Sequence, residues 1–160
     1  MLPTLSKPFL LSCDDLTNED IELIFNKAKY FEENFIPGTK FDDLKGINLA
    51  LAFFENSTRT KLSFELAAKR LSADIKNFNA NTSSLQRGES LLDTLKTIEA
   101  MGVQMYVIRH SSSGAQYFLQ KNTPGIVINA GDGKQEHPTQ ALLDNYTLLK
   151  YFTKISGLKI

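Results

Sequence analysis

Four short apolar runs alternate along this chain with longer segments of helical periodicity. The run 47–54 is apolar nearly throughout, as expected of a strand that is covered on both faces. Further strands are predicted at 74–80, 103–108 and 126–130, and helices at 16–35, 58–71, 89–101, 115–120 and 138–152. Strands that alternate with helices are typical of parallel sheets. We therefore predict an α/β fold with a doubly wound, four-stranded parallel sheet flanked by helices.

The composition indicates a soluble globular protein. The 160 residues are 42% apolar and 22% charged with zero formal net charge, so nothing indicates a nucleic acid or an anionic membrane as partner. No apolar run approaches the roughly 20 residues of a membrane span, and the N-terminus does not resemble a signal peptide. The single Cys13 excludes an internal disulfide and fits a reducing, cytoplasmic compartment. With two histidines and no carboxylate cluster, no metal site is expected.

The junction between the first predicted strand and the following helix is rich in hydroxyl groups. The segment 57–60 is Ser-Thr-Arg-Thr, and a helical pattern follows in which Leu62, Leu66 and Ala67 share one face that Ala68 and Leu71 extend. A helix that starts directly after a strand points its unpaired N–H groups and its positive dipole end over the sheet edge. The segment is therefore predicted to bind an anion such as phosphate. An ordinary helix N-cap is the alternative.

Other polar side chains follow the remaining strands. Arg87 falls in a polar loop, Arg109 ends the third strand, and His137 and Gln140 follow the fourth. Histidine is often a structural residue, but Pro138 places His137 directly before a helix start. Ligands of such sheets bind beyond the carboxyl ends of the strands, and arginine suits phosphate or carboxylate. We therefore predict a pocket for a small phosphorylated substrate, since no glycine-rich ATP or NAD motif is present.

Four segments of the chain resemble the aspartate/ornithine carbamoyltransferase family. They are Ser57-Thr58-Arg59-Thr60 with Ser63-Phe64-Glu65, Ser83-Ser84 with Arg87-Gly88-Glu89-Ser90, Ile108-Arg109-His110, and the stretch 129–144 from Asn129-Ala130-Gly131 to Leu142-Leu143-Asp144. Together they span essentially the whole chain in order. The last stretch is similar to the family members that use aspartate, because the ornithine enzymes usually have Leu-Ala-Asp at its end.

This resemblance implies an activity and an assembly. The activity is transfer of a carbamoyl group from carbamoyl phosphate to the amino group of L-aspartate, an early step of pyrimidine synthesis, with no metal or organic cofactor. The loop with Ser83 and Arg87 is expected to reach the site of a neighbouring subunit in a homotrimer. Regulatory or pathway-enzyme partners are left open, and the expected strand order is 2-1-3-4.

The resemblance also implies roles for the residues at the strand ends. The phosphate is expected to be bound by Ser57, Thr58, Arg59 and Thr60, with Arg59 near the bridging oxygen. The carbamoyl carbonyl is expected to be polarised by Thr60, Arg109 and His137. Gln140 is expected to bind the carbamoyl amide.

The chain departs from the family pattern in three ways. Asn56 replaces the usual Pro, and Arg87 stands where the polar loop usually carries Lys. Family enzymes also have a second domain, which binds aspartate. We therefore assign residues 1–156 to a carbamoyl phosphate domain and 157–160 to the start of a second domain. The 160-residue chain alone is expected to bind carbamoyl phosphate weakly and to be nearly inactive.

Two other functions stay open at this point. The first is an ornithine-type carbamoyltransferase, with ornithine or a modified ornithine as acceptor. It stays open because the residues that bind the acceptor would lie in the second domain. A non-catalytic phosphate-binding or assembly module is the other, because of Arg87 and of the missing second domain.

Overall fold

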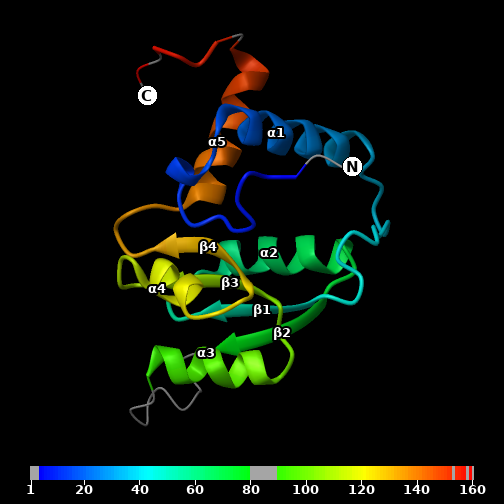
Figure 1. Ribbon diagram of the computed structural model, residues 1–160. Coiled ribbons are helices and arrows are strands. Elements are labelled where there is room, and N and C mark those ends of the chain that lie inside the picture. Colours follow the sequence, from blue (N-terminus) through cyan, green and yellow to red (C-terminus); the bar gives the residue numbers. More distant parts are fainter. Residues whose placement is uncertain (1–3, 80–89, 153, 158, 160) are drawn as a thin grey trace.

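A parallel sheet forms the centre of the molecule (Figure 1). The computed structural model describes residues 4–79, 90–152, 154–157 and 159. The sheet contains the strands β1 (Asn48–Phe53), β2 (Asp74–Asn79), β3 (Met105–His110) and β4 (Ile126–Asp132). Its four strands are all parallel and follow the order β2-β1-β3-β4. The predicted fold class and the expected strand order are therefore confirmed.

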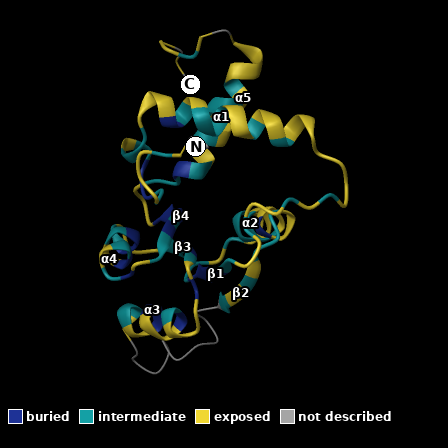
Figure 2. Cartoon of the chain, turned by 45° about the vertical axis from the view of Figure 1, so that its right-hand side comes forward, coloured by how far each residue is buried: buried dark blue, intermediate teal, exposed yellow. Residues whose placement is uncertain are grey.

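Helices follow the strands in the alternation that the sequence predicts. They are α1 (Asn18–Glu33), α2 (Thr58–Arg70), α3 (Leu91–Ala100), α4 (Ala115–Lys121) and α5 (Pro138–Tyr151), preceded by a short 3-10 helix, η1 (Cys13–Asp15). Figure 2 shows α3 and α4 on one side of the sheet and α2 on the other. Helices α1 and α5 lie together, with the ring centroids of Phe25 and Tyr146 5.5 Å apart. No helix in the described part of the chain is long and apolar enough to cross a membrane.

Strand β1 contributes to both layers of the core because its side chains alternate between the faces. Leu49, Leu51 and Phe53 pack with Ala68 of α2. The intervening alanines, 50 and 52, belong to a second cluster with residues of α3 and α4. A strand buried on both faces carries apolar residues at every position, which explains the continuous apolar run in the sequence.

The buried face of α2 includes Ala68, as predicted, but differs from the predicted face at Leu62 and Leu66. Leu62 and Leu66 are 51% and 43% exposed, whereas Ala68 is buried and Phe64 packs against the same cluster. Phe64 and Ala68 are four residues apart and therefore share one helix face. The helix is turned so that this face meets the sheet and the leucine face points outward.

A capping box formed by Thr17 and Asp20 begins α1. The Thr17 side chain accepts a hydrogen bond from the Asp20 N–H, and the Asp20 carboxylate accepts one from the Thr17 N–H at 3.0 Å. Asp20 also accepts hydrogen bonds from the Ser6 N–H at 2.8 Å and the Ser6 hydroxyl at 2.5 Å. These bonds, the Ser6 hydroxyl first, lower the pKa of Asp20 to about 2. Asp20 therefore attaches the N-terminal segment to α1.

Replacing Asp20 with Asn should lower the melting temperature at pH 7. The pKa of Asp20 lies below its ordinary value of 3.8, so its stabilising effect is present above that value and is lost as the pH falls through about 2. Melting curves recorded from pH 7 down to about pH 2 should therefore converge for the variant and the unaltered protein. Asp42→Asn is the control, because among the described residues the Asp42 side chain pairs with Lys45 alone, in an exposed ion pair. Parallel curves at every pH would contradict this role of Asp20.

Candidate functional site

A cavity of about 870 Å³ lies where α2 and α5 begin, beyond the carboxyl ends of the strands. Six of the predicted site residues line it: Ser57, Arg59, Thr60, Arg109, His137 and Gln140. Thr58 is the first residue of α2 and is exposed, and it is not among the residues that line the cavity. The loop residues Ser83 and Arg87 lie outside the described residues.

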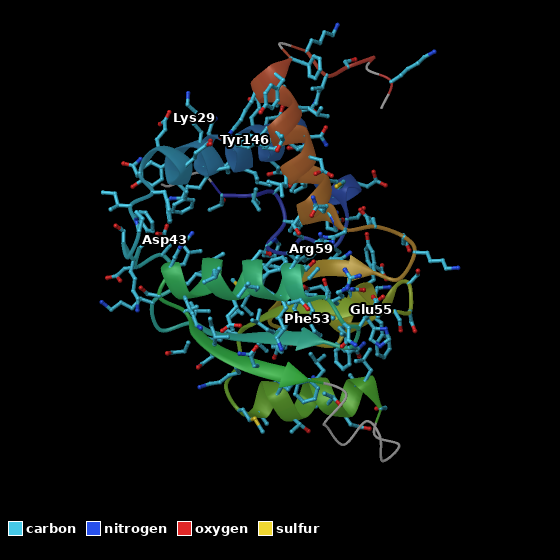
Figure 3. All side chains as sticks on the ribbon, turned by 180° about the vertical axis from the view of Figure 1, so that it is seen from behind. Lys29, Asp43, Phe53, Glu55, Arg59 and Tyr146 are labelled. Carbon is cyan, nitrogen blue, oxygen red and sulfur yellow. The ribbon has the colours of Figure 1, made fainter. Side chains whose placement is uncertain are left out.

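Within the described part of the chain, the start of α2 presents unpaired polar groups to this cavity. Ser57 occupies the N-cap position in an extended conformation, but its side chain makes no capping hydrogen bond. The first turn of the helix contains no acidic residue. Figure 3 shows the path of the chain from Phe53 past Glu55 to Arg59 at the start of α2. The Ser57 hydroxyl and the first N–H groups of α2 are thus available to an anion, which favours the phosphate interpretation over an ordinary N-cap.

Arg109 comes from the next strand of the sheet, where it pairs with Phe53 in the register of β1 and β3. Its Nη1 donates to the Ala130 carbonyl at 3.1 Å. Its Nε lies 3.3 Å from Glu55 Oε2, an ion pair without hydrogen-bond geometry. Since a guanidinium carries five N–H donors, Arg109 keeps donors for a ligand while two neighbours hold it in place.

Glu55, which the sequence analysis did not indicate, contacts the site residue Arg109 without lining the cavity itself. It stands two residues after the end of β1, and its side chain is 41% exposed beside Arg109. The signal in the sequence was a carboxylate directly between a strand end and the Ser-Thr-Arg-Thr segment. Its contact with Arg109 depends on the pairing of β1 with β3, which the local sequence does not reveal.

His137 lies at the N-cap of α5, directly before Pro138 at the first helical position, as predicted. Its Nδ1 is 3.2 Å from the Thr139 hydroxyl oxygen, and its side chain makes no capping bond. Burial, and next the positive charge of Arg109, lower the pKa of His137 below 6.5. The imidazole is therefore mainly neutral at neutral pH, so it can offer a hydrogen bond to a carbonyl without adding charge.

Gln140 follows one turn later on α5. Its Nε2 donates to Asp144 Oδ1 at 2.9 Å, and the residue is exposed at the rim of the cavity. Among the described residues, no group of three or more His, Cys, Asp or Glu is placed to hold a metal ion. The site therefore combines two guanidinium groups, two helix N-termini, hydroxyls and an amide, a set that suits an oxygen-rich anion.

A second cavity, of about 470 Å³, lies between the N-terminal segment, α1, α5 and β4. Its lining is almost entirely apolar and includes Phe9, Ile24, Phe25 and Leu142. With no charged group in its lining, it does not suit a phosphate.

Comparison with known proteins identifies relatives of this fold and site. The family model for the carbamoyl phosphate-binding domain of aspartate/ornithine carbamoyltransferases matches residues 9–150. The aspartate carbamoyltransferase catalytic subunit of Campylobacter fetus is 51% identical over 155 residues, covering 96% of this chain and 50% of that protein. The aspartate carbamoyltransferase catalytic subunit of Flavobacterium johnsoniae is 50% identical over 157 residues, covering 98% of this chain and 51% of that protein. The chain thus spans about half the length of these curated relatives.

Solved structures similar to this chain are also aspartate transcarbamoylases. The aspartate transcarbamoylase of Trypanosoma cruzi in complex with carbamoyl phosphate and aspartate superposes with a TM-score of 0.88 at 30% identity, covering 99% of this chain and 50% of that one. The catalytic subunit of M. jannaschii aspartate transcarbamoylase superposes with a TM-score of 0.84 at 38% identity, covering 95% and 50%.

Replacing Arg109 with Gln should raise the pKa of His137. Burial of the imidazole would persist, but the neighbouring positive charge that disfavours its protonated form would be gone. An NMR titration of the two histidines measures this directly. His110 is the internal control, because its lowered pKa is caused by burial and not by Arg109. If the His137 pKa stays unchanged in the variant, Arg109 does not act on this imidazole.

Proposed function

The chain belongs to the aspartate/ornithine carbamoyltransferase family, and we propose that it supplies the carbamoyl phosphate site of an aspartate carbamoyltransferase. The products of that enzyme are N-carbamoyl-L-aspartate and phosphate. The observation that carries this proposal is the convergence of Arg59, Arg109 and His137 on one cavity from three different elements. Two fixed positive charges and a neutral imidazole fit a ligand with a phosphate at one end and a neutral carbonyl at the other.

In the proposed reaction the neutral amine of aspartate attacks the carbamoyl carbon, the bond from that carbon to the phosphate oxygen breaks, and the amine proton leaves with the phosphate as hydrogen phosphate. Negative charge grows on the carbonyl oxygen during the attack, and Thr60, Arg109 and His137 are the groups assigned to stabilise it. Arg59, together with Ser57, Thr58 and the N-terminus of α2, is assigned to the departing phosphate. Gln140 is assigned to the carbamoyl amide. Catalysis then depends on positioning and charge stabilisation, with no covalent intermediate on the protein.

The acceptor site belongs to a longer protein in this proposal. Residues 1–156 form the carbamoyl phosphate domain, and residues 157–160 lead into an aspartate-binding domain. The support is that the family model for the first domain matches 9–150 while the curated relatives are about twice as long. The longer protein would act as a cytoplasmic homotrimer in pyrimidine synthesis, with the loop of Ser83 and Arg87 completing a neighbouring site.

Carbamoyl transfer to ornithine and a non-catalytic phosphate-binding module are the competing functions. The relatives named as aspartate enzymes favour aspartate over ornithine. Assaying the longer protein with aspartate and with ornithine separates these two. The second competitor predicts binding of phosphate without transfer to either amine.

Replacing Arg59 with Ala should weaken binding of phosphonoacetate, a stable analogue of carbamoyl phosphate, about 10- to 100-fold, which is the usual effect of removing one hydrogen-bonded charge. Calorimetric titration of the 160-residue chain gives the affinity. The matched control is Arg70→Ala in the last turn of the same helix, where the guanidinium stacks on Phe35 at 4.2 Å, outside the cavity. Equal affinities of the two variants, or no binding by the unaltered chain, would overturn the phosphate site.

A further inference from the structure

Strand β4 contains a bulge directly opposite Arg109. Ile108 pairs with Asn129 and His110 pairs with Asp132, so Arg109 faces the two residues Ala130 and Gly131. A bulge inserts one residue into a strand and redirects the neighbouring side chains. The irregularity thus lies at the point where the sheet presents Arg109 to the cavity.

Gly131 provides the space that the Arg109 guanidinium occupies. A Cβ at this position would stand 2.3 Å from Arg109 Nη1 and 2.9 Å from Cζ. The φ of Gly131 is +130°, a conformation that side chains disfavour. The guanidinium lies against the peptide between Ala130 and Gly131 and donates to its carbonyl at 3.1 Å. The position of Arg109 therefore depends on the orientation of this peptide.

Two fully buried amides hold, from behind, this peptide and the following Gly131–Asp132 peptide, to which the Gly131 carbonyl belongs. The Gly131 N–H donates to Asn129 Oδ1 at 2.8 Å. Gln116, from α4, approaches with Nε2, which donates to the Gly131 carbonyl at 2.8 Å and also lies 3.2 Å from Asn129 Oδ1 and 3.3 Å from the Ile108 carbonyl. Both Gln116 and Asn129 are 0% exposed. Asn129 is itself fixed because its Nδ2 donates to the Leu11 carbonyl at 2.7 Å.

Gln116 and Arg109 act on the bulge from opposite faces of the sheet. Val107, which shares the strand face of Arg109, packs in the cluster with α2, whereas Gln116 belongs to α4 on the other side. Gln116 is therefore separated from the ligand cavity by the strand itself. Its amide bridges β3 at Ile108 and β4 at Gly131, the two strands between which the extra residue is inserted.

We propose that Gln116 is a positioning residue for Arg109: by holding the Gly131 carbonyl and the Asn129 side chain that binds the Gly131 N–H, it fixes the bulge of β4 and with it the guanidinium where the carbamoyl phosphate site needs it. The inference rests on the proposed function for the identity of the ligand, but the effect on Arg109 itself is independent of any ligand. Removing the Gln116 amide frees the Gly131 carbonyl and one contact of the Asn129 side chain, so the two peptides that meet at Gly131 rotate and the guanidinium loses its defined position.

A second glutamine of α4 offers a control of the same chemistry. One turn later, Gln120 Nε2 donates to the Gly125 carbonyl at 3.0 Å, and its Oε1 accepts from the Val127 N–H at 2.9 Å. Gln120 thus holds the beginning of β4 as Gln116 holds its end. A purely structural role predicts the same consequences for both residues, whereas a positioning role predicts an effect on the site for Gln116 alone.

The experiment compares Gln116→Met with Gln120→Met, since methionine keeps the length of the side chain and removes its hydrogen bonds. In the ligand-free chain, the NMR signals of the Arg109 Nε–H group and of the Gly131 amide should shift or broaden in Gln116→Met and stay in place in Gln120→Met. Phosphonoacetate affinity should fall about 3- to 10-fold in Gln116→Met only, the range expected for contacting residues. Unmoved Arg109 and Gly131 signals in Gln116→Met, or equal losses of affinity in both variants, would overturn the proposal.

Two further measurements distinguish a failure of the proposed function from a failure of the proposed role of Gln116. If the unaltered chain binds neither inorganic phosphate nor phosphonoacetate, the proposed function fails, while the ligand-free NMR comparison still decides the role of Gln116. If Gln116→Met does not fold, phosphate is titrated into the unaltered chain instead. The Gln116 side-chain amide signals should then move with those of Arg109 while the Gln120 signals stay, and stationary Gln116 signals would contradict the coupling.

Discussion

Parallel pairing of β1 with β3 and of β3 with β4 places three strand ends at one edge of the sheet. Arg109 stands at the end of the middle strand, and the chain leaves β1 and β4 to begin α2 and α5 beside it. The start of α2 directs its first N–H groups toward this space, and the start of α5 brings His137 and Gln140 to it. The cavity is thus a consequence of strand direction, because antiparallel neighbours would have sent these groups to opposite edges.

Positive potential at the site arises from placement and not from composition, since the formal net charge of the chain is zero. Arg59 and Arg109 both line the cavity, and their charges add to those of the two helix N-termini. Glu55 offsets part of the charge of Arg109 at 3.3 Å. Burial keeps His137 mainly neutral, so the site gains a polar group without further repulsion between cations.

The sequence predicts most of this arrangement because the relevant signals are local. Apolar runs with turns between them identify the strands, and the polar segments 57–60 and 137–140 identify the starts of α2 and α5. What the sequence did not predict is the rotation of α2 about its own axis and a contact that depends on how β1 pairs with β3. Helical periodicity marks two neighbouring apolar faces on α2, and only packing shows that Phe64, not Leu62, meets the sheet. The contact of Glu55 with Arg109 likewise depends on strand pairing.

The bulge in β4 shows the limit of local signals most clearly. The letters Asn-Ala-Gly-Asp-Gly consist largely of turn formers, so the sequence predicts a strand that stops at Ala130. The strand continues to Asp132 because buried amides replace the regular ladder around Gly131. Gln116 is read in the sequence as one polar residue of a short helix, yet it is completely buried. A buried amide is costly unless it is hydrogen-bonded: the Gln116 Nε2 group is offset by the strand carbonyls that it binds, whereas its Oε1 has no partner among the described residues.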